Sequence, residues 1–253
     1  MARDNAVTPL KAAIGDAIAA AYAVGGLRAP AAGCRVLMYH AIGGAVAGDT
    51  QQLYSLAPDL FARHVGMLKR HPVVSLSEGI ARGEGLAVTF DDGYRDNLTV
   101  AAPLLVEAGI PFTVFVVPTF VESGAPQYLS RSEVVSLARL PGVTIGAHGY
   151  SHARLTACDD GTLARELTAS RAWLEDLLGA PVTTMSYPHG AVDDRVAAAA
   201  AAAGFTLAAC SRFGSHRIGG DCYRVPRTDI WSFDGARRLQ SKIAGQWDWM
   251  AWR

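Results

Sequence analysis

From residue 34 onward, short runs of β-branched and aromatic residues alternate with segments whose apolar residues recur at helical spacing. Consecutive parallel strands need a long crossover, usually a helix, so repeated strand–helix units predict one parallel sheet covered by helices. The number of units favours a single-domain α/β fold whose sheet is closed or nearly closed into a barrel. An open doubly wound sheet is the alternative, although neither a G-x-G-x-x-G fingerprint nor a Walker-type loop supports its nucleotide-binding form.

The alternation also predicts where each element lies. Strands are expected at 35–39, 86–90, 111–117, 143–147, 182–186 and 205–209. Helices are expected at 60–68, at 100–108, after a capping box formed by Ser130 and Glu133, at 163–178 and at 196–203. Gly109, Gly179 and Gly204 follow three of these helices, as is common where a helix ends.

Composition is that of a globular protein with a large core. Of the 253 residues, 50% are hydrophobic and 18% are charged. The 23 basic and 23 acidic residues balance and form no Lys/Arg-rich run, which argues against nucleic acid as a partner and favours a neutral or weakly charged ligand. The cysteines form no C-x-x-C pair, so reduced thiols are expected rather than a zinc knuckle or a redox dithiol.

The N-terminal part carries an apolar run at 17–27 that has the length of a secretory signal peptide. Asp4 and Asp16 interrupt the positive region that such a signal needs, and the run is too short to span a membrane. We therefore expect an Ala-rich helical extension at 1–33, a barrel domain at 34–253 and a cytoplasmic location. The extension and the Trp-rich segment 247–253 could also contact the inner membrane peripherally or a partner subunit, with packing on the domain as the alternative. The oligomeric state is left open.

Two carboxylates stand at the end of a predicted strand. Asp91 and Asp92 directly follow the strand at 86–90 and precede Gly93. Active sites of barrels form at the C-terminal ends of their strands, so this position favours a catalytic role. A turn that caps the next segment would use the same residue types, and the pair alone does not decide between the two.

Two histidines follow another predicted strand. His148 comes directly after the strand at 143–147, and the spacing to His152 lets two imidazoles meet at one ion if the segment turns helically. Histidines in loops are often ordinary surface residues. Combined with the aspartates, however, they predict a three-ligand catalytic site for zinc or a similar divalent ion, with one position open for water or substrate. Further polar residues recur at the strand ends near 186–190 and 223–229.

In this order, the motifs resemble those of the polysaccharide deacetylases of carbohydrate esterase family four, the NodB homology family. The matching segments are Thr89-Phe90-Asp91-Asp92-Gly93-Tyr94, His148-Gly149-Tyr150-Ser151-His152 and Tyr187-Pro188-His189-Gly190. The likeness extends from about Val36 to Arg227, and Val36-Leu37-Met38-Tyr39-His40 is most similar to the branch of poly-N-acetylglucosamine deacetylases and other envelope-glycan enzymes. The resemblance implies a distorted (β/α)7-type barrel that hydrolyses the N-acetyl group of a hexosamine to acetate and a free amine.

The resemblance also implies a role for each motif residue. Asp92, His148 and His152 would bind a divalent metal ion, with Zn2+ expected and Ni2+, Co2+ or Mn2+ as alternatives. Asp91 would be the general base. The substrate-binding positions would be Tyr94, Tyr187, Pro188 and His189.

Three positions depart from the usual pattern of the family. Most members place the acid histidine in a late Leu-x-His motif that this sequence lacks, so we assign the acid to His40 of the early Tyr-His pair, with a structural histidine as the alternative. Ser186 stands where many members have an arginine that orients the base, and Arg227 is the candidate to pair with Asp91 instead. Position 149 is often Ser or Thr, so Gly149 predicts that one hydrogen bond behind the metal ligands is missing.

We therefore expect a metal-dependent carbohydrate de-N-acetylase that acts on the linear amide bond of an N-acetylated saccharide. A cytoplasmic location favours a nucleotide-linked or lipid-linked precursor of O-antigen lipopolysaccharide or capsule over finished cell wall. The alternatives are a related metal hydrolase of another small amide, and a catalytically inactive relative that binds glycan.

Overall fold

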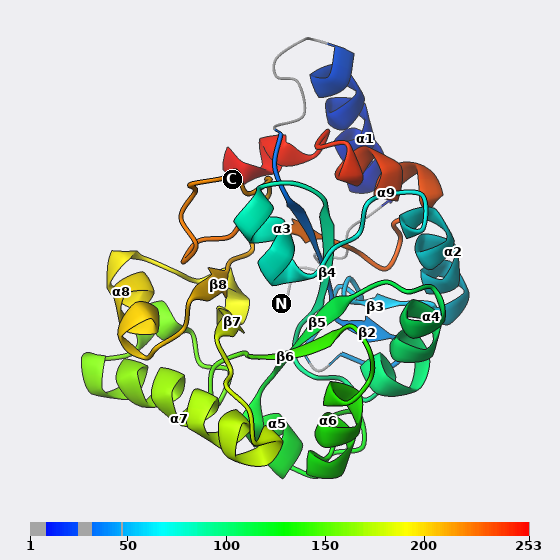
Figure 1. Ribbon diagram of the computed structural model, residues 1–253. Helices are drawn as coiled ribbons and strands as arrows, with labels where there is room; N and C mark the ends of the chain where they lie inside the picture. The colour runs from blue at the N-terminus through cyan, green and yellow to red at the C-terminus, as the bar shows by residue number, and fades with distance from the viewer. Residues whose placement is uncertain (1–8, 25–31, 47, 253) are drawn as a thin grey trace, which may run out of the picture.

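A computed structural model describes residues 9–24, 32–46 and 48–252. Within these ranges, seven strands form one parallel sheet in the order β8-β7-β6-β5-β4-β1-β9. The strands are β1 (Arg35–Tyr39), β4 (Leu86–Phe90), β5 (Phe112–Val116), β6 (Val143–Ala147), β7 (Thr184–Ser186), β8 (Leu207–Ala209) and β9 (Thr228–Asp229). The sheet curls and the helices surround it (Figure 1). The predicted single-domain α/β fold of distorted (β/α)7 type is thus confirmed.

One segment near the C-terminus joins the two edges of the sheet. Val225 forms a parallel bridge with Ala209 of β8. The same segment continues into β9, which pairs with Leu37 and Met38 of β1. Arg227 lies on this crossing between β8 and β1, and it is fully buried.

Helices begin and end at residues whose local chemistry favours those positions. The capping box predicted at Ser130 and Glu133 is present at the start of α6. Asp159 and Asp193 accept backbone N–H groups at the starts of α7 and α8. The helices are α1 (Pro9–Val24), α2 (Pro58–Leu68), α3 (Leu76–Arg82), α4 (Ala102–Glu107), α5 (Pro118–Glu122), α6 (Arg131–Ala138), α7 (Asp160–Leu178), α8 (Asp194–Ala202) and α9 (Ala236–Ile243).

Several short elements differ from the sequence prediction. The helix expected at 100–108 starts earlier, with a π-helical turn at Asn97–Ala101 that leads into α4. A separate parallel pair joins β2 (Ala41–Ile42) to β3 (Ser55–Leu56). Neither this pair nor β9 was predicted, because a strand of two residues carries no alternation pattern.

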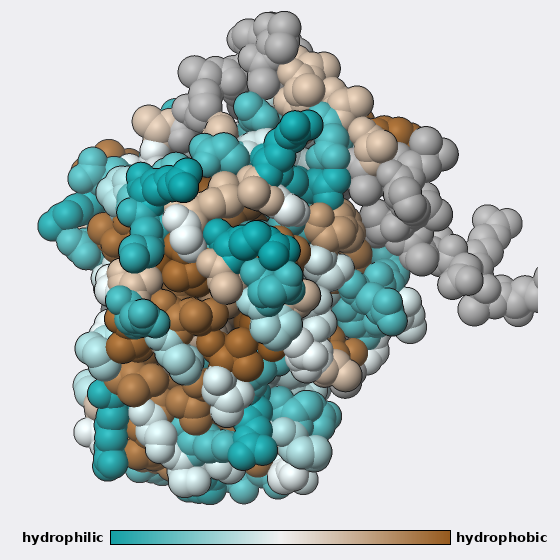
Figure 2. Space-filling model, turned by 90° about the vertical axis from the view of Figure 1, so that its right-hand side faces the viewer, coloured by the Kyte–Doolittle hydropathy of each residue, from teal (hydrophilic) through white to brown (hydrophobic). Residues whose placement is uncertain are grey.

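The core lies between the sheet and its helices. All residues of β1, β4 and β5 are buried, which agrees with their nearly continuous apolar runs. Figure 2 shows the side of the molecule with α2 and α4, where apolar side chains gather between polar ones. Leu60, Met67 and Leu104 are partly buried hydrophobic residues of these helices that pack on the core. The two helices therefore cover the core from this side.

α1 packs against the C-terminal part of the chain. Ala19 clusters with Phe213 and Trp247, and Asp16 pairs with Arg238 of α9. Of the helix predicted at 17–27, residues 17–24 are helical, and 25–27 lie outside the described residues. The boundary at residue 33 stays a prediction. Among the described residues, no helix is long and apolar enough to cross a membrane.

Candidate active site

A cavity of about 430 Å³ lies at the C-terminal ends of the strands. Its walls come from residues that directly follow β1, β4 and β6, together with the loop between β2 and β3. The side chains with chemical function that line it are Met38, His40, Asp49, Tyr54, Asp91, Asp92, His148, His152, His189, Ser211 and Asp229. The predicted base, acid and metal ligands therefore share one cavity.

The two aspartates at the end of β4 lie on a tight turn. The backbone of Asp92 is left-handed, with φ of 73°, and that of Gly93 has φ of 70°. This conformation is unfavourable by about 1 kcal/mol or more for a residue with a Cβ atom, so surrounding contacts must hold it. The N–H of Asp91 donates to the Tyr39 carbonyl of β1 at 3.0 Å, which anchors the turn.

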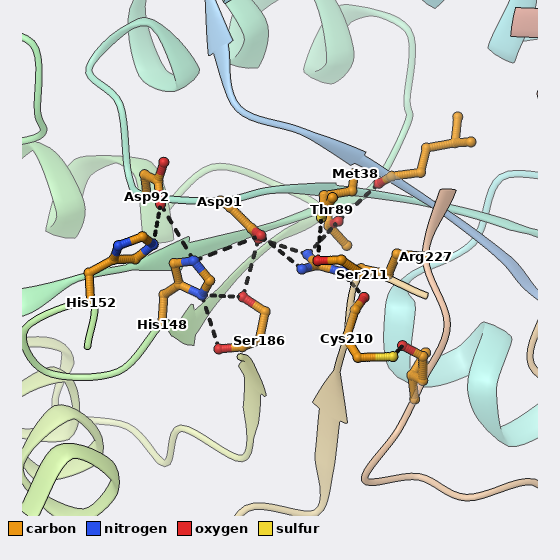
Figure 3. A network of polar contacts seen from close by, with 12 residues as sticks. Met38, Thr89, Asp91, Asp92, His148, His152, Ser186, Cys210, Ser211 and Arg227 are labelled. Carbon is orange, nitrogen blue, oxygen red and sulfur yellow. Dashed lines mark hydrogen bonds and ion pairs between the residues drawn. The ribbon is translucent and has the colours of Figure 1, made fainter. Parts of the chain in front are cut away.

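Asp92, His148 and His152 form a set that fits a metal ion. One ligand atom from each lies within 4.8 Å of the others. Asp92 Oδ1 is 3.4 Å from His148 Nε2 and 3.3 Å from His152 Nε2. This carboxylate oxygen is buried without a hydrogen-bond partner, which is costly unless a cation or a further donor satisfies it. Figure 3 shows the three side chains directed toward one another.

The two histidine side chains come together without the helical turn that their spacing suggested. The segment from His148 to His152 is a loop. Gly149 and His152 have left-handed backbones, with φ of 68° and 62°. These two reversals fold the loop back on itself, so the rings converge without helical geometry, 5.0 Å apart between centroids.

The protonation states suit metal binding at His152 more than at His148. Burial and the neighbouring His148 lower the pKa of His152 to about 4, so its imidazole is neutral near pH 7. Burial also lowers the pKa of His148, but Asp91 and Asp92 outweigh this effect and raise it overall. His148 Nδ1 lies 3.0 Å from the Ser186 carbonyl, and a proton donated there leaves Nε2 of the neutral ring free to face Asp92.

Asp91 is held by Arg227 in a buried bidentate ion pair. The two N–O distances are 2.7 and 2.8 Å, and Ser186 Oγ donates to the same carboxylate at 3.2 Å. Burial would raise the pKa of Asp91, but the charges of Arg227 and His148 hold it well below its usual range. The structure therefore brings together the pair suggested by the sequence, while the role of Arg227 in orienting a base stays a proposal.

His40 follows β1 and lines the cavity beside Asp229. Its ring packs on Tyr54 at 4.5 Å, and its Nδ1 is buried without a hydrogen-bond partner. Asp229 Oδ2 accepts the indole N–H of Trp231 at 3.1 Å, while Oδ1 is buried and without a partner. Burial raises the pKa of Asp229, and the charge of His40 opposes this rise, so the two groups are close enough to interact.

Of the four predicted substrate-binding residues, His189 lines the cavity with its ring 4.5 Å from that of His152. The other three are buried and do not appear among the described residues that line it. Tyr94 stacks on Tyr128, and the Tyr187 hydroxyl donates to a backbone carbonyl. Their side chains are thus engaged in packing, as is that of Pro188.

Sequence reasoning missed other residues of the cavity. Asp229 stands in a stretch noted for its polar residues, and its place at a strand end could have marked it. Asp49 and Tyr54 come from the loop between β2 and β3, which carries no motif. The pKa of Tyr54 is raised, chiefly by the charge of Asp229.

Comparisons with known proteins bear on the family and the fold of the chain. The sequence profile of the polysaccharide deacetylase family matches residues 79–208. The Bacillus subtilis protein YxkH, which bears the name of a polysaccharide deacetylase, is 26% identical over 143 residues, covering 56% of this chain and 50% of its own. Chitin deacetylase 1 of Cryptococcus neoformans is 33% identical over 119 residues, covering 47% of this chain and 24% of its own. The chain thus spans half or less of the length of these relatives. The fold is similar to that of the Streptococcus pyogenes deacetylase PplD, with a TM-score of 0.74, 21% identity, and coverage of 83% of this chain and 97% of that one.

Proposed function

The chain belongs to the polysaccharide deacetylase family, and we propose that it is a metal-dependent hydrolase that removes an N-acetyl group from an amino sugar of a glycan or glycan precursor. One observation carries the proposal. Asp91, fixed by Arg227, lies in the same cavity as the convergent set Asp92, His148 and His152. A buried carboxylate beside a three-ligand site with an open position is the arrangement that metal-assisted hydrolysis requires.

Asp92, His148 and His152 would hold the ion. Two nitrogens and one oxygen suit Zn2+, and they also suit Ni2+, Co2+ or Mn2+. Such an ion, when bound, polarises a carbonyl and makes water more acidic. The unpartnered Oδ1 of Asp92 and the neutral ring of His152 support this assignment.

Asp91 would take the proton from the attacking water. Its bidentate pairing with Arg227 fixes both carboxylate oxygens and leaves the group ionised at every pH near neutrality. A carboxylate with so low a pKa is a weak base, so Asp91 would depend on the metal ion to make the attacking water more acidic. The acidic limit of activity would then be set by groups other than Asp91.

His40 would supply the proton that the departing amine needs, because an amide nitrogen leaves poorly until it is protonated. It lines the same cavity as Asp91 and the proposed metal ligands, which supports this role. Asp229 would orient the imidazole, because it lines the same cavity and is close enough to His40 for their charges to interact.

The cavity suits a saccharide with little negative charge. Its volume of about 430 Å³ lies within the range of about 300–1,000 Å³ that is typical of small-molecule sites. Asp49 and Asp229 add carboxylates to its wall, and none of the described lining residues is Lys or Arg. We infer a neutral N-acetylated sugar at this position, within a cell-envelope glycan such as O-antigen or capsule, or a lipid-linked precursor handled in the cytoplasm or at the inner membrane.

The test is acetate release from N-acetylated saccharides by purified protein, with bound metal quantified in the same preparation. Wild type should contain a divalent ion and turn over, whereas Asp91→Asn should keep the ion and lose turnover. Metal binding without acetate release from any saccharide would indicate a hydrolase of another small amide or an inactive glycan-binding relative. Protein that binds no divalent ion would refute the proposal.

A further inference from the structure

The loop that carries the second histidine is anchored from behind by one buried carboxylate. Glu166 belongs to α7 and is only 8% exposed. Its Oε2 accepts the backbone N–H groups of Tyr150 and Ser151, both at 2.9 Å, and its Oε1 accepts the Ser151 hydroxyl at 2.5 Å. All three bonds go to the two residues that directly precede His152.

The loop is shaped to let this carboxylate come close. A Cβ atom at Gly149 would lie 3.3 Å from Glu166 Oε2 and 3.1 Å from Pro188 Cγ, and the backbone there is left-handed. Glycine at position 149 therefore leaves room for the Glu166 carboxylate. The space that a larger residue would fill is thus used by the carboxylate that accepts the N–H groups of Tyr150 and Ser151.

The loop needs such support because His152 itself has a left-handed backbone, with φ of 62°. A residue with a Cβ atom keeps this conformation only when its surroundings enforce it. Hydrogen bonds from N–H groups to an ionised carboxylate are shorter and stronger than neutral ones, and Glu166 makes two of them. On the other side of the loop, the Tyr150 carbonyl accepts the Thr119 N–H at 3.1 Å. The loop is thus clamped between α7 and α5.

We propose that Glu166 is a positioning residue for the metal centre, which sets the affinity for a divalent cation by holding His152 Nε2 opposite Asp92 before the ion arrives. The proposal rests on the proposed function, because it presupposes that Asp92, His148 and His152 bind a metal ion. Groups that orient metal ligands typically change affinity by about 10–100-fold when they are removed.

The experiment measures Zn2+ affinity of metal-free protein by competition with a chromophoric chelator, beside the thermal unfolding of the same metal-free samples. Glu166→Ala should bind Zn2+ about 10–100-fold more weakly than wild type. Glu166→Gln should stay closer to wild type, because its amide oxygen can accept both N–H groups and its NH2 can donate to the Ser151 hydroxyl.

Glu175→Ala is the matched control. Glu175 lies on the same helix and accepts the Val182 N–H at 2.9 Å, outside the set of residues that line the cavity. Its loss should lower the unfolding temperature and leave Zn2+ affinity unchanged. Equal Zn2+ affinity in Glu166→Ala and wild type, or an equal weakening in Glu175→Ala, would overturn the proposal.

If Glu166→Ala fails to fold, Ser151→Ala decides the question, because it removes only the hydroxyl bond to Glu166. A severalfold loss of Zn2+ affinity supports the proposal, and an unchanged affinity refutes it. Wild-type protein that binds no Zn2+ would instead contradict the metal centre itself. Failure of the Glu166 proposal and failure of the proposed function are therefore distinguishable.

Discussion

Replacement of Arg227 by methionine would test whether the buried ion pair controls Asp91. Methionine fills similar space without charge, and it leaves the carboxylate in a site where its side chain is only 4% exposed. Loss of one partner from a buried ion pair costs about 3–5 kcal/mol, because the remaining charge is uncompensated. For a protein of this size, that corresponds to a fall in Tm of about 6–20 °C.

The loss of stability in Arg227→Met should be larger at high pH than at low pH. In wild type the folded-state pKa of Asp91 is depressed. Its contribution to stability is therefore present above the unfolded value of about 3.9 and is lost only as pH falls through the lower folded value. In Arg227→Met, the positive charge that opposes the effect of burial on Asp91 is lost. The pKa of Asp91 therefore rises, and Asp91 takes up a proton as the pH is lowered. The deficit relative to wild type should be large at pH 8 and smaller at pH 5.

Thermal unfolding of metal-free protein at both pH values measures this effect. The double variant Asp91→Asn/Arg227→Met should regain most of the lost stability, because the unpaired charge at position 91 is removed. Arg35→Met is the control, since Arg35 also forms a bidentate pair, with the partly buried Asp248, and Asp91→Asn should not rescue it. A deficit equal at pH 5 and pH 8, or a double variant as unstable as Arg227→Met, would refute the reasoning.

Three further predictions concern the acid, the metal and the core. His40→Ala should lower kcat about 10²–10⁴-fold while the protein keeps its zinc, and loss of zinc would show that His40 supports the fold or the metal instead. Burial lowers the pKa of His148, but the neighbouring carboxylates raise it overall, so a proton competes with the metal ion for this imidazole. Zn2+ affinity in competition titrations should therefore fall when the pH is lowered from about 8 to about 6, and a flat profile would contradict this. Lys242→Met should reduce the free energy of unfolding, measured in urea, by about 3–5 kcal/mol, because Lys242 and Asp234 form a fully buried ion pair. Recovery of stability in Asp234→Asn/Lys242→Met would confirm the cause.

Local sequence signals predicted the regular elements well. The strands β1, β4 and β6 have the predicted bounds, because their apolar runs stand between clear turn residues. The capping box at Ser130 and Glu133 involves residues three positions apart, so the sequence contains all the information that it needs. The placement of Asp91 and His148 in one cavity followed from the rule that parallel strands end at the same edge.

The contacts behind the site depend on residues far apart in the sequence. Arg227 and Asp91 are separated by 136 positions, and position alone suggested their pairing without fixing it. Glu166 occurs in an amphipathic helix where a glutamate is usually solvated, and only the close approach of the loop at Gly149 shows its use. The loop conformation of the histidine motif required left-handed backbones that its spacing does not reveal.

The segment that crosses from β8 to β1 also comes late in synthesis. Strands β1 through β8 all precede Arg227 in the sequence, so they are synthesised before it. Without Arg227 the carboxylate of Asp91 lacks its bidentate partner, and burying it in that state is costly. The crossing segment that joins the two edges of the sheet therefore also carries the positive charge that this carboxylate needs. Closure of the sheet and charge balance at Asp91 thus depend on the same few residues.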